Sequence, residues 1–171
     1  MSTEPRRWEG LKRFLIGRSI SRTLLRIAVL IAIIAVGYRW IFLPFLVDGD
    51  SMLPALRDGN VHIAYRLAYR SQEPQRGDMV VLNIAGGRDL LVKRIIGLPG
   101  ERFAIKEGVV LINGEPLDEP YLKLRSRDWE LAEVVLRPEE FYFIGDNRSM
   151  NMANHTAGTI RVERILGRVI C

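Results

Sequence analysis

Residues 79–96 read Met-Val-Val-Leu-Asn-Ile-Ala-Gly-Gly-Arg-Asp-Leu-Leu-Val-Lys-Arg-Ile-Ile. Two runs rich in β-forming side chains, 79–84 and 90–96, flank the pair Gly86-Gly87, and this pattern predicts two strands joined by a hairpin turn. Similar runs predict further strands over 61–65, 109–112, 141–144 and 165–170. Because strands do not alternate with helices after the first 45 residues, we predict a mainly β fold and not a parallel βαβ sheet.

Composition limits the class of protein. The chain has 171 residues, of which 48% are hydrophobic and 26% charged, so it is typical of one globular domain with an appendage. The polar stretch 115–140 predicts an irregular insertion between strands. The single cysteine, Cys171, excludes an intrachain disulfide, a CxxC redox motif and a cysteine zinc site.

The positive charge is concentrated at one end of the chain. Residues 1–26 contain seven basic and two acidic side chains, which equals the whole net charge of +5. The other 145 residues contain 18 basic and 18 acidic side chains. A nucleic-acid partner is therefore not expected, because the body lacks a basic surface.

An apolar run follows the basic tail. Residues 27–47 contain one charge, Arg39, and about 20 apolar residues are enough to span a bilayer. We predict a basic cytoplasmic tail over 1–23, a single transmembrane anchor over 24–44 and an extracytoplasmic domain over 45–171, oriented by the positive-inside rule. A buried core helix followed by a strand is one alternative. A cleaved signal peptide is another, although a small-x-small cleavage site is missing.

A serine and a lysine form a candidate catalytic pair. Ser51 lies just beyond the apolar run, between Gly49 and Pro54, in a sequence that favours a tight turn. Neither histidine lies in a recognisable triad motif. Lys93 interrupts an apolar strand, where burial would favour the neutral amine that a general base requires. The alternative is a turn serine and a solvent-facing lysine.

Four segments and the anchor resemble type I signal peptidases, which are membrane-bound Ser-Lys endopeptidases. The segments occur in the family's order at 50–56 (Asp-Ser-Met-Leu-Pro-Ala-Leu), 76–81 (Arg-Gly-Asp-Met-Val-Val), 93–101 (Lys-Arg-Ile-Ile-Gly-Leu-Pro-Gly-Glu) and 145–148 (Gly-Asp-Asn-Arg). The resemblance implies a signal-peptidase-like β-sheet catalytic domain that removes signal peptides from exported preproteins. It makes Ser51 the nucleophile and Lys93 the general base.

The resemblance also implies the surroundings of the pair. The Ser51 N–H would stabilise the oxyanion, because Gly49 stands where some members carry a serine. Pockets for small residues at the −1 and −3 positions would be lined by Val47, Met52, Leu56, Leu91 and Val92. The expected partners are signal peptides and the bilayer, which residues 42–47 and 52–53 would touch. The family acts without a metal or organic cofactor, and we expect a monomer.

The last motif departs from the family. Asn151 stands where a serine usually holds the lysine amine, and its amide oxygen is expected to orient Lys93 instead. Ala153 replaces an aspartate, so Arg94 is expected to lose its partner. Ser149 could replace the missing serine by a shift in register. Asp146, Asn147 and Arg148 keep the motif and are expected to support the site.

Two alternatives to a general signal peptidase follow from this departure. One is a Ser-Lys peptidase specialised for one or a few substrates. The other is a non-catalytic homologue that binds preproteins, which the retention of Ser51 and Lys93 argues against. For His155, where the family often has arginine, a structural polar contact is favoured over a catalytic role, and His62 is expected to be structural.

Overall fold

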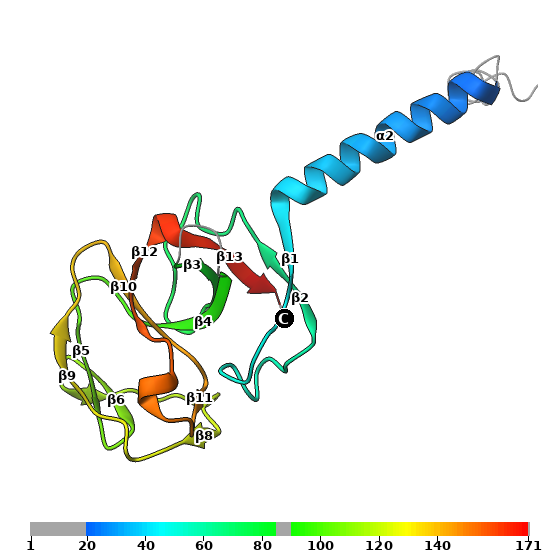
Figure 1. The fold of residues 1–171 in the computed structure, drawn as a ribbon. Coiled ribbons are helices and arrows are strands. Elements are labelled where there is room, and N and C mark those ends of the chain that lie inside the picture. Colours follow the sequence, from blue (N-terminus) through cyan, green and yellow to red (C-terminus); the bar gives the residue numbers. More distant parts are fainter. Residues whose placement is uncertain (1–19, 85–89, 171) are drawn as a thin grey trace, which may run out of the picture. The chain divides into compact units, whose positions relative to one another are not determined.

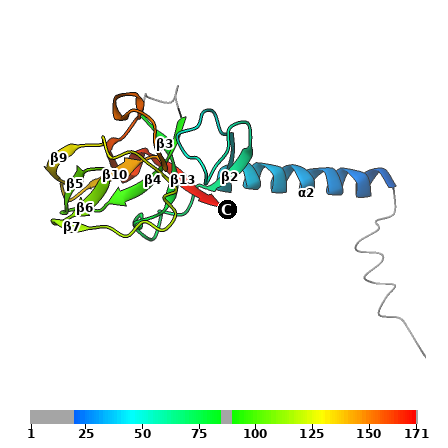
Figure 2. The same ribbon diagram turned by 90° about the horizontal axis from the view of Figure 1, so that it is seen from below.

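The protein is described by a computed structural model that covers residues 20–84 and 90–170. The chain divides into two units, Met1–Ile41 and Phe42–Cys171. The described part of the first unit is one helix, α2 (Ile20–Ile41), and the second unit is built from strands (Figures 1 and 2). The prediction of a mainly β fold with one N-terminal apolar helix is therefore confirmed.

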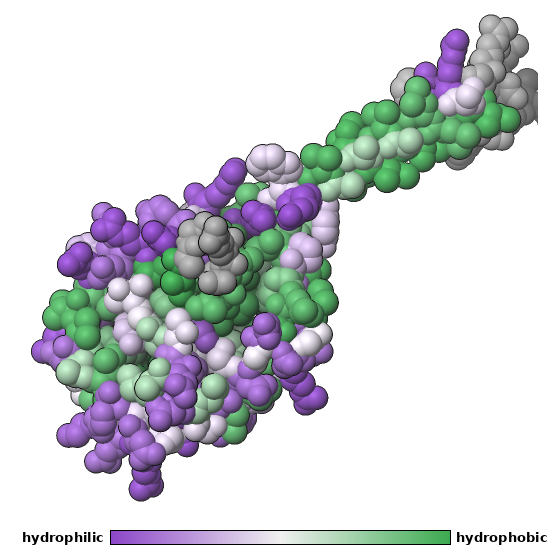
Figure 3. All heavy atoms as spheres, in the orientation of Figure 1, coloured by the Kyte–Doolittle hydropathy of each residue, from purple (hydrophilic) through white to green (hydrophobic). Residues whose placement is uncertain are grey.

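Helix α2 is apolar, and none of its residues is buried. It has 22 residues and a mean hydropathy of 2.0 over its most apolar window, and none of that window is buried. Hydrophobic residues cover most of the helix face that the space-filling view shows (Figure 3). The helix is long and apolar enough to cross a membrane. A core helix, the first alternative above, would instead have a buried face.

The helix ends earlier than the predicted anchor does. The sequence predicts an anchor over 24–44, whereas α2 ends at Ile41 and β1 (Phe42–Leu46) follows at once. Pro44 explains this boundary, because proline lacks an N–H and disfavours helical geometry in the residue before it. Pro44 is tolerated in β1 because β1 is an edge strand.

The main sheet has seven antiparallel strands in the order β1-β2-β13-β3-β4-β10-β12. Beside β1, its members are β2 (Val61–Tyr65), β3 (Met79–Asn83), β4 (Leu90–Gly97), β10 (Glu140–Ile144), β12 (Gly158–Arg161) and β13 (Ile165–Ile170). The predicted hairpin is present as the β3/β4 pair, in which Val80 lies opposite Lys93. Its predicted turn at Gly86-Gly87 lies outside the described residues.

A second sheet contains four antiparallel strands in the order β7-β6-β5-β9. These are β7 (Glu115–Pro116), β6 (Val109–Ile112), β5 (Arg102–Lys106) and β9 (Leu131–Val135), and a short parallel pair joins β8 (Leu124–Arg125) to β11 (Asn147–Arg148). The prediction that 115–140 is irregular is thus wrong in part. The segment includes β9, and it also contributes the fully buried Trp129 and Leu136 to the core.

Two short 3₁₀ helices complete the described elements, η1 (Met152–Asn154) and η2 (Val162–Arg164).

Residues 42–47 alternate between buried and exposed positions, as expected for a strand with one face on the core. Leu43 and Val47 are buried, and so is Met52, which is 1% exposed. These three side chains therefore belong to the core, which corrects the expectation that they touch lipid. Leu46 of the same strand is 63% exposed.

Candidate active site

Ser51 and Lys93 meet although 42 residues separate them. Ser51 lies in a turn after β1, where Gly49 has a φ of +91° that favours glycine. Lys93 lies in the middle of β4. The Lys93 Nζ donates a hydrogen bond to the Ser51 Oγ at 2.6 Å. An amine and a hydroxyl at this distance can exchange a proton directly.

The surroundings of Lys93 favour its neutral form. The residue is 3% exposed, between the buried neighbours Val80 and Ile95. Burial lowers the pKa of Lys93 from its ordinary value of 10.5 to about 8, while the negative charge of Asp146 acts in the opposite direction. A pKa near 8 leaves roughly a tenth of the amine neutral at pH 7. Lys93 is therefore able to accept a proton near physiological pH.

Arg94, next to the base, is paired. Its Nε donates to Asp146 Oδ1 at 2.8 Å, and its guanidinium lies 4.0 Å from the centre of the Tyr121 ring. The expectation that Arg94 loses its partner with the replacement at Ala153 is therefore wrong, because Asp146 of the same motif is the partner. It follows that burial, and not an unpaired Arg94, lowers the pKa of Lys93.

Asn147 holds the backbone on which the serine is carried. Its backbone N–H donates to the Ser51 carbonyl at 3.0 Å, and its side-chain Nδ2 donates to the Asp50 carbonyl at 3.1 Å. Ser149 in turn donates its hydroxyl to Asn147 Oδ1 at 2.6 Å. The Gly-Asp-Asn-Arg motif thus fixes the turn that presents Ser51.

Arg148 is anchored by a residue that sequence reasoning missed. Its NH1 donates to Glu119 Oε2 at 2.7 Å, and both side chains are 1% exposed. The Tyr121 hydroxyl donates to the same carboxylate at 2.6 Å. Because Tyr121 also lies against Arg94, the segment before β8 connects the two buried ion pairs of the site. Glu119 carries no signal in one sequence, since its partner is 29 residues away.

Apolar side chains gather beside the serine turn. Val47, Met52 and Leu56 form one buried cluster, and Val92 packs against it together with Phe45 and Met79. Four of the five predicted pocket residues are therefore brought together. Leu91 packs in a different cluster, with Val80 and Ile95 among its members, because neighbouring residues of a strand point to opposite faces.

Comparison with known proteins shows which family the chain belongs to. A family model described as signal peptidase, peptidase S26, matches residues 20–171. The chain belongs to this family. Signal peptidase I of Bacillus caldolyticus is 33% identical over 154 residues, which cover 82% of this chain and 84% of that protein. Signal peptidase I T of Bacillus subtilis strain 168 is 36% identical over 151 residues, which cover 82% and 77%. The chain is therefore a peptidase.

A solved structure was also found. The crystal structure of a signal peptidase I from Enterococcus faecalis V583 matches with 23% identity and a TM-score of 0.46. The match covers 57% of this chain and 97% of that chain.

Two predicted contacts of the peptidase are replaced by others. The exposed Asn151 accepts from the Ala153 N–H at 2.9 Å and so caps η1, and its amide oxygen does not orient Lys93 in this structure. The Ser149 hydroxyl bonds to Asn147 and does not take the place of the missing serine. Gly49, which stands where some members of the family carry a serine, donates its N–H to Asp58 Oδ1 at 2.8 Å within the turn.

The two histidines of the peptidase have different surroundings. His155 is 8% exposed, and its Nε2 accepts from the Gly145 N–H at 2.9 Å, which agrees with the structural polar contact favoured above. His62 lies in β2 beside the Phe45 ring, with 6.1 Å between ring centres.

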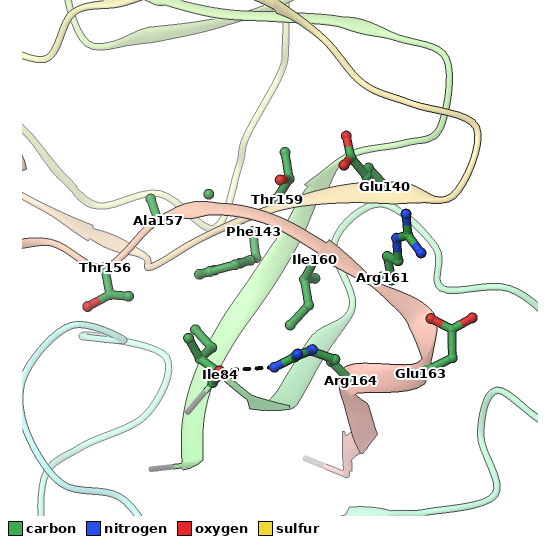
Figure 4. A pocket seen from close by; sticks show the side chains of 11 residues that line it. Ile84, Glu140, Phe143, Thr156, Ala157, Thr159, Ile160, Arg161, Glu163 and Arg164 are labelled. Carbon is green, nitrogen blue, oxygen red and sulfur yellow. Dashed lines mark hydrogen bonds between the residues drawn. The ribbon is translucent and has the colours of Figure 1, made fainter. Parts of the chain in front are cut away.

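A hollow of about 820 Å³ lies elsewhere on the main sheet (Figure 4). Its described lining comes from Ile84 just after β3, from β10, from β12 and the two residues before it, and from η2. Phe143 and Ile160 are among its apolar residues. Arg164 donates to the Ile84 carbonyl across its lower edge at 3.1 Å. Neither Ser51 nor Lys93 is among these lining residues, so the hollow is separate from the Ser51–Lys93 pair.

Proposed function

We propose that this peptidase removes N-terminal signal peptides from exported preproteins, with Ser51 as the nucleophile and Lys93 as the general base. The observation that carries the proposal is the 2.6 Å contact between the Lys93 Nζ and the Ser51 Oγ, made by a lysine that is 3% exposed. A serine is a weak nucleophile unless a base removes its proton, and a buried amine can supply that base. The same residues would have no chemical use in a protein that only binds preproteins.

The reaction would proceed in two steps, acylation of Ser51 and hydrolysis of the acyl-enzyme, and both use the Ser51 Oγ and the Lys93 Nζ. Neutral Lys93 accepts the Ser51 proton while the Ser51 Oγ attacks the scissile carbonyl. The resulting ammonium returns the proton to the leaving amine, and an ester links the signal peptide to Ser51. Lys93 then takes a proton from water as the water oxygen attacks the ester carbonyl. It returns that proton to the Ser51 Oγ as the ester bond breaks, which releases the signal peptide with a free carboxyl group and restores the serine and the neutral lysine.

The negative charge on the attacked carbonyl oxygen needs a donor. The Ser51 backbone N–H is the nearest candidate, because it belongs to the nucleophile itself. Asn147 supports this role, since its two hydrogen bonds fix the carbonyls of Asp50 and Ser51 and with them the peptide unit that carries the N–H.

Small side chains are the expected residues at the −1 and −3 positions of the substrate. The apolar cluster of Val47, Met52 and Leu56 beside Ser51 is already filled by its own side chains, each at most 5% exposed. Substrate side chains would therefore rest against a packed apolar surface, where an alanine-sized group fits without displacing atoms and a larger one does not.

Helix α2 is the proposed membrane anchor. Its apolar residues are exposed along the whole helix, and seven basic side chains lie within residues 1–26. By the positive-inside rule the tail faces the cytoplasm and the strands of the second unit lie outside the membrane. Signal peptides and the enzyme would then share one bilayer.

The test is cleavage of a purified preprotein with alanine at −1 and −3 by the full-length chain in detergent. We expect a single cut after the −1 alanine, and Ser51→Ala or Lys93→Ala should lower kcat by at least about 10³-fold. Ser71→Ala is the matched control, because it removes a serine outside the site. Cleavage that survives either active-site substitution would contradict the mechanism. An equal rate with phenylalanine at −1 would contradict the proposed specificity.

A further inference from the structure

We propose that His155 is a positioning residue that holds Gly145, and through it the Ser51 backbone, by accepting a hydrogen bond as a neutral imidazole. The inference rests on the proposed function, because it concerns the geometry of the same nucleophile. The sequence favours a structural polar contact for His155 over a catalytic role. Because His155 lies beside the turn that carries Ser51, the loss of this contact should change the position of the nucleophile and lower the rate of the reaction.

The direction of the hydrogen bond fixes the protonation of the ring. The Gly145 N–H donates to His155 Nε2 at 2.9 Å, so Nε2 must carry a lone pair and the proton must lie on Nδ1. A protonated ring would direct a second N–H at the Gly145 N–H and break the contact. The interaction therefore requires the neutral form.

Gly145 lies in contact with both the imidazole and the nucleophile turn. A Cβ built on Gly145 would lie 2.3 Å from the Ser51 carbonyl oxygen and 2.6 Å from His155 Cε1. These distances leave no room for a side chain, so the Ser51 carbonyl and the His155 ring both pack against Gly145 on the side where a Cβ would lie. A shift of His155 would be passed to the Ser51 carbonyl, which Asn147 holds from the same motif.

The ring itself is held in place. Trp129 packs against it edge to face, with 4.8 Å between ring centres and an angle of 66°. The Trp129 Nε1 donates to the Met150 carbonyl at 2.7 Å, so the indole is fixed on the chain that leads to His155. The contact between Trp129 and His155 leaves the imidazole little freedom to turn.

The charges around His155 keep it neutral. Burial lowers the pKa of His155 to about 4, and the positive charges of Lys93 on β4 and Arg148 on β11 act in the same direction. Trp129 adds no charge. Asp146 is paired with Arg94, and its negative charge also acts on Lys93. His155 thus stays uncharged over the range in which Lys93 titrates. A permanent cation at this position would repel the ammonium form of Lys93 and lower its pKa.

The test compares three substitutions in the full-length chain with the preprotein assay above. His155→Gln keeps an acceptor near Nε2 and should hold kcat within about fivefold of the wild type. His155→Leu removes the acceptor and should lower kcat at least about 30-fold with KM changed less than threefold. His62→Leu, the same change at the other histidine, is the control and should leave kcat unchanged within about twofold.

The pH profile separates positioning from a general loss of folded protein. His155→Arg should move the acid limb of kcat/KM to lower pH, because the added cation acts on Lys93. A smaller folded fraction lowers the rate without moving the limb. Equal kcat for the Leu and Gln substitutions, or an unmoved limb with Arg, would overturn the proposal.

A measurement independent of turnover covers the case in which the proposed function fails. Nitrogen NMR of the ¹⁵N-histidine-labelled chain should show an unprotonated Nε2 on His155 from pH 5 to 9. The Gly145 amide signal should move in His155→Leu and stay nearly in place in His155→Gln. A protonated Nε2 would overturn the proposal whether or not the chain cleaves. A chain that does not cleave, with Nε2 unprotonated, would contradict the proposed function and support the contact.

Discussion

Lys93 is buried at a cost in stability, and this cost is the physical reason that it can act as a base. An ordinary lysine is charged at neutral pH and stays in water. Here burial in β4 favours the neutral amine and lowers its pKa to about 8. A side chain of similar length without a charge should therefore be more stable at the same position.

The first prediction at this scale is that Lys93→Met abolishes cleavage and stabilises the fold. Below pH 8 the amine is protonated in the folded and unfolded states, and we expect a gain of about 1–3 kcal/mol in the free energy of unfolding. Between pH 8 and 10.5 the unfolded state binds more protons, so wild-type stability rises with pH and the gain shrinks. Urea unfolding at pH 7 and pH 10 measures both values. A less stable Met variant at pH 7 would argue that Lys93 is not desolvated.

Single residues differ in how far the sequence predicts them. Ser51 and Lys93 could be paired because each lies in a motif and burial of a strand lysine has a known chemical effect. The contacts of Asn151 could not be predicted from the sequence, because its amide oxygen can accept from a backbone N–H as well as from the Lys93 amine. In the 3₁₀ turn the Ala153 N–H is the donor. The catalytic roles of Ser51 and Lys93 stay a prediction.

At the scale of elements, the segment from β7 to β9 supports the site. Glu119 of this segment forms the ion pair with Arg148. The Tyr121 ring lies against the Arg94 guanidinium. The Trp129 ring packs against His155. The sequence predicts an irregular insertion here because its residues are polar. The strands that the structure has here are two to five residues long, too short to give a clear alternating pattern. Polarity was misleading, since Glu119 is buried as one half of an ion pair. A single sequence contains no signal for such a distant partner.

The second prediction is that Glu119→Ala destabilises the domain by about 3 kcal/mol, because it leaves the Arg148 guanidinium buried and unpaired. The control is Glu133→Ala on β9, whose pair with Arg102 is 3.7 Å long and about half exposed. That change should cost less than about 1 kcal/mol. Thermal unfolding of both variants gives the comparison. Equal losses would show that the buried pair contributes no more than the exposed one.

At the scale of the whole molecule, the sequence predicts the order of parts better than their boundaries. Hydropathy indicates an apolar segment, and β-forming runs indicate the strands that follow. The main-sheet order, with the last strand β13 between β2 and β3, has no local signal, because it depends on pairing between distant segments. The end of the anchor was missed because strand β1 is as apolar as the helix before it.

The third prediction is that Ile31→Arg combined with Ile34→Arg releases the chain from membranes. Each arginine near the middle of a spanning helix costs about 2.5–3.5 kcal/mol of insertion free energy. Alkaline extraction of membranes should leave the wild type in the pellet and move the double variant to the supernatant. The control is the double variant Thr156→Arg and Thr159→Arg, which adds the same two charges at exposed positions outside α2. This variant should stay in the pellet. Release of the wild type would argue against α2 as an anchor.

The most direct test of Ser-Lys catalysis is the pH dependence of kcat/KM for the full-length chain. If neutral Lys93 is the base, kcat/KM should rise tenfold per pH unit below pH 7 and level off above a pKa near 8. Ser51→Ala and Lys93→Met should remove this activity at every pH. A profile that is flat from pH 6 to 9, or one in which Lys93→Met retains activity with the same limb, would contradict the assignment of Lys93 as the base.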